Sequence, residues 1–151
     1  MSASPSSTPG RYRHTLRVRY GEVDQQGVVF NAHYLAFMDD ALEHWLATLG
    51  DLRGPHLWDM MLKKCTIEWQ GSAGSGDHLD LDLAVVKWGR TSWTVGYLGT
   101  CRGAPVFTAE VVYVSVRLGA GEAIATPAAI RAALGEAVDL FGAERPPAGD
   151  R

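Results

Sequence analysis

One short stretch of the chain, residues 19–34, has the residue types and spacing for chemistry on an electrophile. It leads from an alternating, strand-like segment through a polar turn into a segment with helical periodicity. The turn carries Asp24 and Gly27, and Asn31 is suited to cap the helix that follows. The free N–H groups of a helix N-terminus attract negative charge. Such a turn can therefore aim a carboxylate at a group held on the first turn of the helix.

The carboxylate of Asp24 has two possible roles. Aspartate is ionised at neutral pH, so it could attack directly, whereas as a general base toward water it would be weak unless burial changed it. The alternative is structural, because an aspartate before a glycine often only organises a turn. For an isolated aspartate before a glycine the structural interpretation would prevail. Here the helix cap that follows, together with the family resemblance given below, favours the chemical one.

Hydrophobic periodicity predicts the elements that position this stretch. Thr15–Tyr20 alternates and predicts a half-buried strand. Asn31–Leu49 has apolar residues at spacings of three and four, which predicts a helix of about five turns, and Gly50 is its expected stop. The expected buried face consists of Leu35, Met38, Leu42, Trp45 and Leu49.

Beyond a less regular stretch, Asp51–Met61, which Gly54-Pro55 is expected to break, the period changes to two. The expected strands are Lys63–Trp69, His78–Trp88, Ser92–Cys101 and Val106–Leu118. Short turns join the last three, which predicts an antiparallel meander. A final helix is expected over Pro127–Leu140, with Thr126 as its cap.

This order of elements predicts an α+β domain in which one long helix lies across a twisted sheet. The domain is expected over residues 11–141, with disordered tails at residues 1–10 and 142–151. Val106–Leu118 is apolar on both faces, so it should be a central strand. A partner subunit is the simplest cover for its second face, which predicts an oligomer.

Composition excludes several classes of protein. The chain has 151 residues, 46% of them hydrophobic and 21% charged, as in one soluble domain. A net charge of −3 without a basic cluster argues against a nucleic-acid partner. No apolar run is long enough to span a bilayer, and the first ten residues do not resemble a signal peptide. Cys65 and Cys101 are expected to be free thiols, the histidines show no metal-ligand spacing, and we expect a cytoplasmic location.

The pattern Tyr-x-x-x-Asp-x-x-Gly-Val-Val-Phe-x-x-x-Tyr runs from Tyr20 to Tyr34, directly before the long helix. It resembles the hotdog-fold acyl-CoA thioesterases of the 4-hydroxybenzoyl-CoA thioesterase type. Weaker matches follow at Ile67–Trp69, Gly76-Asp77 and Arg90–Ser92, so the resemblance covers about Arg13–Leu118. The family usually has an Asp-x-Asp pair, and here Glu22 replaces its first member.

The resemblance implies hydrolysis of an acyl- or aroyl-CoA thioester to the free acid and CoA, without a cofactor. Asp24 would be the nucleophile or general base, and a backbone amide at or beside Asn31 would stabilise the oxyanion, with Gly27 allowing close approach. The remaining candidate substrate contacts are Tyr34, Val28, Phe30, Glu68, Arg90, Thr91 and Ser92. Glu68 is also a reserve catalytic acid, and the last three could equally form only a polar hairpin turn. The resemblance further implies a homodimer or homotetramer with its active site at a dimer interface.

Other functions are weighed against this one. A serine hydrolase is excluded because no Gly-x-Ser-x-Gly occurs and the chain is too short for that architecture. A hotdog dehydratase is the nearest enzymatic alternative, but such enzymes pair a histidine with a carboxylate, and the motif lacks a histidine before Gly27. A non-catalytic acyl-CoA binding or sensing protein is the second alternative, since a fold does not imply turnover.

Overall fold

The computed structural model describes residues 10–142, and the expected α+β arrangement is confirmed. The elements in chain order are β1 (Arg11–Arg17), the 3-10 turn η1 (Tyr20–Glu22), α1 (Ala32–Thr48), α2 (Arg53–His56), β2 (Trp58–Trp69), β3 (His78–Trp88), β4 (Ser92–Cys101), β5 (Ala104–Arg117) and α3 (Ala128–Leu134). The tails expected to be disordered lie outside the described residues, apart from Gly10 and Gly142. Between these two glycines, no helix is long and apolar enough to cross a membrane.

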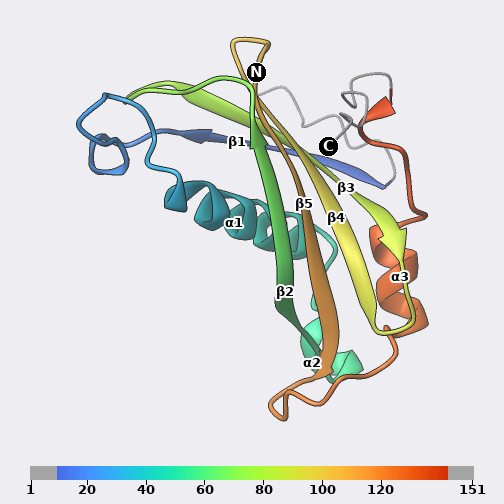
Figure 1. Ribbon diagram of the computed structural model, residues 1–151. Helices are drawn as coiled ribbons and strands as arrows, with labels where there is room; N and C mark the ends of the chain where they lie inside the picture. The colour runs from blue at the N-terminus through green and yellow to red at the C-terminus, as the bar shows by residue number, and fades with distance from the viewer. Residues whose placement is uncertain (1–9, 143–151) are drawn as a thin grey trace, which may run out of the picture.

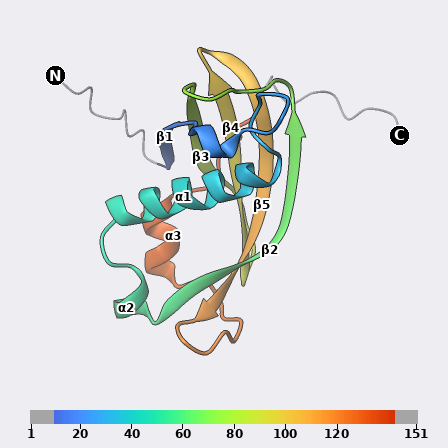
Figure 2. The ribbon, with the colours of Figure 1, turned by 90° about the vertical axis from the view of Figure 1, so that its left-hand side faces the viewer.

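The five strands form one sheet in the order β1-β3-β4-β5-β2, and every neighbouring pair is antiparallel. The expected meander of β3, β4 and β5 is therefore confirmed. Helix α1 lies across one face of the twisted sheet, at a steep angle to the strands (Figures 1 and 2). Strands β1 and β2 form the two edges of the sheet.

The core lies between α1 and this face of the sheet. The buried residues of the helix are Tyr34, Phe37, Met38, Ala41, Leu42, Trp45 and Leu46. Leu35 and Leu49, which were expected to be buried, are only half-buried, so the apolar stripe is wider than the predicted one and turned toward Tyr34 and Phe37. From the sheet, Leu81, Tyr97 and Val111 are fully buried. Each such side chain contributes about 1.5–3 kcal/mol by leaving water.

The first strand begins and ends earlier than predicted. Strand β1 covers Arg11–Arg17, not Thr15–Tyr20, and the side chain of Tyr20 is 86% exposed in η1. The strand ends where its partner β3 begins, because Arg17 is paired with His78. Beyond this point, Val18 N–H donates a hydrogen bond at 2.8 Å to Asp77 O, which lies in the loop that precedes β3.

Two other predicted boundaries are wrong for local reasons. The stretch expected to be irregular contains α2, with Gly54 and Pro55 inside it, because proline is tolerated in a first helical turn. Strand β2 then starts at Trp58, five residues before the prediction. Helix α3 ends at Leu134 and not at Leu140, because Gly135 leaves the helical region with a φ of +91°.

The second face of the sheet is covered in part by the chain itself. Beyond α3, the chain passes the edge of β3 that β1 leaves free, and Val138 N–H donates to Val85 O at 2.9 Å. Leu140 and Phe141 then lie over Gly96 of β4, so that a Cβ there would approach their side chains to 3.2 and 3.1 Å. The chain itself thus covers part of this face, and a partner subunit as the cover for the second face of β5 stays a prediction. The segment with Leu140 and Phe141 does not cover the second face of β5 completely, since Val112 and Val114 on that face are half-buried.

Candidate active site

The polar turn of the motif is a tight hairpin. Val23 and Val29 form an antiparallel bridge, and Asp24 N–H donates to Val28 O at 2.9 Å. The turn closes through Gly27 N–H, which donates to Asp24 O at 3.0 Å. Gly27 has a φ of +77°, a conformation that residues with a Cβ rarely adopt. The sequence therefore places a glycine where this hairpin needs one.

The carboxylate of Asp24 is half-buried and is partly used by the turn. Its Oδ1 accepts a hydrogen bond from Gln26 N–H at 2.8 Å, which is an Asx-turn. Among the described residues, Oδ2 has no hydrogen-bond partner. One oxygen thus orients the side chain while the other is available to a substrate or a water molecule.

The start of α1 offers free backbone donors. Asn31 is the N-cap residue, as expected, but its side chain makes no capping hydrogen bond and its backbone is already helical, with φ −51° and ψ −38°. Within residues 10–142, the N–H groups of Asn31 and Ala32 have no backbone acceptor. These donors lie at the positive end of a 17-residue helix, which carries about half an elementary charge.

The loop between β2 and β3 holds the hairpin in place. Val29 N–H donates to Ala73 O at 2.9 Å, and a Cβ on Gly74 would come within 3.2 Å of Gly27 O. Asp77 fixes this loop, since its carboxylate accepts from Gly74 N–H and from the Arg102 guanidinium, both at 2.8 Å. The hydrogen bond from Gly74, aided by Arg102, lowers the pKa of Asp77. The small residues after β2 thus allow two turns to pack against each other.

Glu22, which stands in place of the family's first aspartate, has a structural role. It is buried, and its carboxylate accepts Arg19 N–H at 2.7 Å and the Arg19 guanidinium at 3.2 Å. Burial alone would raise the pKa of Glu22, but the hydrogen bonds and the charge of Arg19 outweigh burial and lower this pKa. Phe30 N–H donates to Glu22 O at 3.0 Å, so Glu22 also anchors the far arm of the hairpin.

Aromatic side chains form a wall beside the first turn of α1. Tyr34 is 2% exposed and makes edge-to-face contacts with Trp69 and Phe107, at centroid distances of 5.8 and 5.1 Å. Its hydroxyl has no hydrogen-bond partner in the described part of the chain, and burial raises its pKa. Phe30 is 47% exposed and contacts His33 edge-on. Trp69 is also 47% exposed and was not a candidate from the sequence.

Of the remaining candidates, Val28 lies in the hairpin and the others lie apart from it. Val28 is half-buried in the hairpin, but Glu68 is exposed on the opposite face of β2 from Trp69, because side chains alternate along a strand. Arg90 and Thr91 lie in the turn that follows β3, and Ser92 begins β4. The hairpin lies at the other end of β3, about 30–35 Å away along its 11 residues. A single chain therefore does not bring Arg90, Thr91 and Ser92 to Asp24.

The sequence did not reveal a polar chain that leads from two buried tyrosines to Asp39, an exposed residue in the middle of α1. The hydroxyls of Tyr97 and Tyr113 are 2.9 Å apart, and Tyr113 donates to Asp39 Oδ1 at 3.5 Å. Burial raises the pKa of Asp39 more than this hydrogen bond lowers it. Cys65, a half-buried free thiol, lies close enough for its pKa to be raised by Asp39 as well as by burial. Cys101 is also free, as expected.

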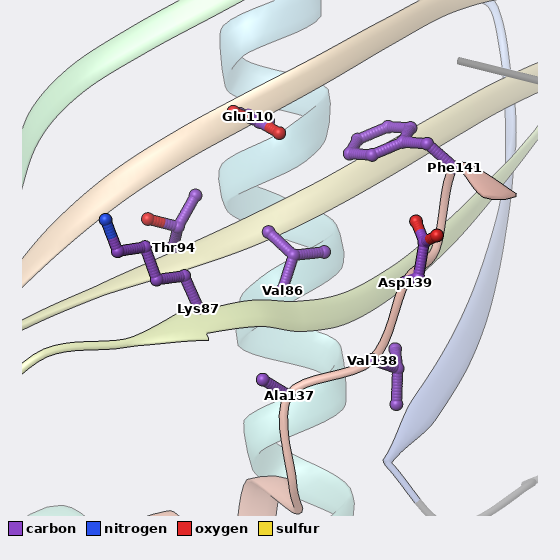
Figure 3. A pocket seen from close by; sticks show the side chains of 8 residues that line it. All are labelled: Val86, Lys87, Thr94, Glu110, Ala137, Val138, Asp139 and Phe141. Atoms are coloured by element: carbon purple, nitrogen blue, oxygen red, sulfur yellow. The ribbon is translucent and has the colours of Figure 1, made fainter.

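A cavity of about 500 Å³ opens on the sheet face that is turned away from α1 (Figure 3). Val86, Lys87, Thr94 and Glu110 line it from the strands, and the segment with Asp139 and Phe141 closes one side. The hairpin with Asp24 contributes no residue to it. We therefore base the candidate site on Asp24 and the start of α1.

Comparison with known proteins agrees with this fold. The 1,4-dihydroxy-2-naphthoyl-CoA hydrolase of Synechococcus elongatus is 27% identical over 107 residues, which are 68% of this chain and 79% of that protein. Among solved structures, a 1,4-dihydroxy-2-naphthoyl-CoA thioesterase from Synechocystis matches with a TM-score of 0.72 and 19% identity, covering 83% of this chain and 96% of the other. A gentisyl-coenzyme A thioesterase matches with a TM-score of 0.73 and 19% identity, covering 82% and 99%.

The strongest assignment comes from a sequence profile of a whole family. The profile described as the thioesterase-like superfamily matches residues 18–134, which include the hairpin, α1, the meander and α3. These are the elements that build the candidate site and the core beneath it. The chain therefore belongs to the thioesterase-like superfamily.

Proposed function

We propose that this protein hydrolyses an acyl-CoA thioester to the free acid and CoA, with Asp24 as the catalytic carboxylate. The observation that carries the proposal is the hairpin itself. It holds a carboxylate with one uncommitted oxygen a few residues from the unpaired N–H groups at the start of α1. Membership of the thioesterase-like superfamily supports thioester hydrolysis as the reaction.

The chemistry follows from the charges at the two ends of the hairpin. A thioester carbonyl oxygen placed at Asn31 or Ala32 would accept backbone N–H donors and gain from the helix dipole as negative charge develops on it. Asp24 Oδ2 would then attack the carbonyl carbon and expel the CoA thiolate, leaving a mixed anhydride that a water molecule cleaves to the free acid and the Asp24 carboxylate. Alternatively, Asp24 would remove a proton from a water that attacks the carbonyl carbon and expels the thiolate. Asn31 thus acts through its backbone, and Gly27 acts by allowing the turn.

The aromatic wall favours an aroyl group as the acyl part of the substrate. Phe30 and Trp69, each 47% exposed, offer aromatic surface to a ligand, and Trp69 packs edge-on against the buried Tyr34 in the first turn of α1. Aromatic pairs gain about 0.5–1.5 kcal/mol beyond their buried area. Relatives of this chain whose names describe naphthoyl-CoA and gentisyl-CoA substrates support the same class. We propose Phe30 as a contact to this ring, with Tyr34 acting from beneath by holding Trp69 in position.

A second copy of the chain completes the proposed site. The edge strand β2 pairs only with β5 among the described strands, and it exposes 57% of Met61, 41% of Leu62 and 47% of Trp69. An exposed apolar edge strand is a template for pairing with another chain. Within one chain, Arg90, Thr91 and Ser92 lie far from Asp24. In a homodimer, the same residues of the second copy would be available to bind the CoA arm and its phosphates.

The test is thiol release from a panel of aromatic, short-chain and long-chain acyl-CoAs, with wild type and Asp24→Asn compared. Asparagine keeps an oxygen that can accept Gln26 N–H, so the turn should survive while the charge is lost. We expect activity on the aroyl esters, and a loss of about 10²–10⁴-fold in the variant at unchanged stability.

Matched variants separate chemistry from structure. Asp51 is another loop aspartate that accepts a backbone N–H, from Gly54 at 3.4 Å, so Asp51→Asn should keep full activity. If Glu68→Gln abolishes turnover while Asp24→Asn retains it, the assignment of Asp24 is wrong. Tight binding of the esters without thiol release by wild type would instead favour a non-catalytic binding protein.

A further inference from the structure

Two histidines and an aspartate meet where β1 passes over the second half of α1. Asp40 and His44 lie one turn apart on the helix, and His14 comes from the facing side of β1. Asp40 Oδ2 is 3.6 Å from Nε2 of His14 and 3.6 Å from Nε2 of His44. The three possible ligand atoms all lie within 4.8 Å of one another.

These atoms are close but are not engaged with other groups. No side-chain hydrogen bond of His14, Asp40 or His44 is found within residues 10–142, and 3.6 Å exceeds the usual length of one. Ligands about 2.0–2.1 Å from a tetrahedral zinc ion lie roughly 3.3 Å from each other. The two separations of 3.6 Å from Asp40 are close to this spacing. The two imidazole rings are stacked, so His44 must turn for both Nε2 lone pairs to point at one ion.

The position of His14 on its strand is unusual for a packing residue. Its neighbours on the same side of β1, Tyr12 and Leu16, pack against the core, and Tyr12 stacks on Trp45 at 6.3 Å. His14 instead has 13% of its side chain exposed and stacks on His44 at a centroid distance of 4.4 Å. The side chain of His44 is 54% exposed, so it is free to turn its Nε2 toward a shared ion.

We propose that His14, Asp40 and His44 form a binding site for a divalent transition-metal ion, with Zn²⁺ as the best match. Two imidazoles and one carboxylate are a donor set that suits zinc and its neighbours and does not suit Mg²⁺ or Ca²⁺, which prefer oxygen ligands. The ion would tie the edge strand β1 to α1. Water would fill the remaining coordination position, because the cluster opens to solvent.

The site is separate from the proposed chemistry, since Asp40 lies nine residues beyond Asn31, or about 14 Å along the helix.

The experiment is calorimetric titration of the chelator-treated, tag-free full chain with ZnCl₂, together with thermal unfolding with and without the ion. We expect one Zn²⁺ per chain and a higher melting temperature, because an ion that binds only the folded state stabilises it. His44→Ala and Asp40→Asn, at exposed positions, should weaken binding roughly tenfold or more and remove the thermal shift. His14→Ala should do the same if it folds.

His78→Ala is the matched control, because His78 is an exposed histidine at the start of β3 outside the cluster. It should bind Zn²⁺ like wild type. The proposal is overturned if wild type binds no Zn²⁺, or if His44→Ala binds it with unchanged affinity, which would place the ion at Cys65 or elsewhere.

Discussion

Replacing Gly99 with alanine should displace a buried aromatic ring in the wall beside the proposed site. Gly99 on β4 is paired with Phe107 on β5, and the Phe107 ring lies across the glycine. A Cβ at position 99 would lie 2.2 Å from Cε1 and 2.4 Å from Cδ1 of that ring. Phe107 is 1% exposed and contacts Tyr34 at 5.1 Å, so the ring has no solvent-filled space to enter.

The sign of the change in the free energy of unfolding distinguishes Gly99 from a glycine that has free space around it. Where the backbone permits alanine, glycine-to-alanine replacement stabilises a protein by about 0.4–1 kcal/mol through the unfolded state. Overpacking a dense core costs about 1–3 kcal/mol. We therefore expect Gly99→Ala to lower the free energy of unfolding by roughly 1–3 kcal/mol and the melting temperature by about 2–12 °C.

Urea denaturation measures the change, with the slope of the transition expected to stay constant. Gly21→Ala is the control, because a Cβ there meets nothing within 4 Å. It should be neutral or slightly stabilising. The double variant Gly99→Ala/Phe107→Leu should lose less stability than the sum of the single variants, since a smaller side chain relieves the clash. Unchanged or increased stability of Gly99→Ala would refute the reasoning.

Two further predictions concern the hairpin and the edge of the sheet. Folding lowers the pKa of Glu22, so the ionised carboxylate stabilises the folded state. This contribution is fully present above the pKa of the unfolded chain, about 4.3, and it is lost as the pH falls through the lower pKa of the folded state. Glu22→Gln should thus be about 1–2 kcal/mol less stable than wild type at pH 7, and the difference should shrink below about pH 4; a gap independent of pH in denaturation curves would contradict this. Met61→Lys, at a side chain 57% exposed on β2, should shift sedimentation from dimer toward monomer; an unaltered dimer would place the interface elsewhere.

Local patterns were sufficient to predict most elements. The alternation in β3, β4 and β5 and the short turns between them predicted the meander, because each strand has one face against α1. The spacing of Met38, Leu42 and Trp45 predicted the long helix for the same reason. The boundaries of β1 and β2 were missed because the end of a strand depends on where its partner ends, as the pairing of Arg17 with His78 illustrates.

The candidate site, like the fold, was predictable from the sequence only in part. The spacing of Asp24, Gly27 and Asn31 could be recognised because one hairpin and the first turn of one helix hold all three. Trp69 could not be placed beside Tyr34 from the sequence, because their contact depends on how α1 crosses the end of β2. The distance between Arg90 and the hairpin could not be predicted either, because it depends on which end of β3 lies beside the hairpin.

The sequence by itself determined the arrangement of one long helix on an antiparallel sheet, and it marked the turn that carries the proposed chemistry. Both follow from residues close together in the chain, where periodicity and turn geometry act. Tertiary structure alone decided which distant groups meet: the aromatic wall, the wrapping of residues 137–141 around β3, and the approach of His14 to Asp40 and His44. The physical reason is that the twist of the sheet and the packing angle of α1 arise from the whole core at once, and no local pattern encodes them.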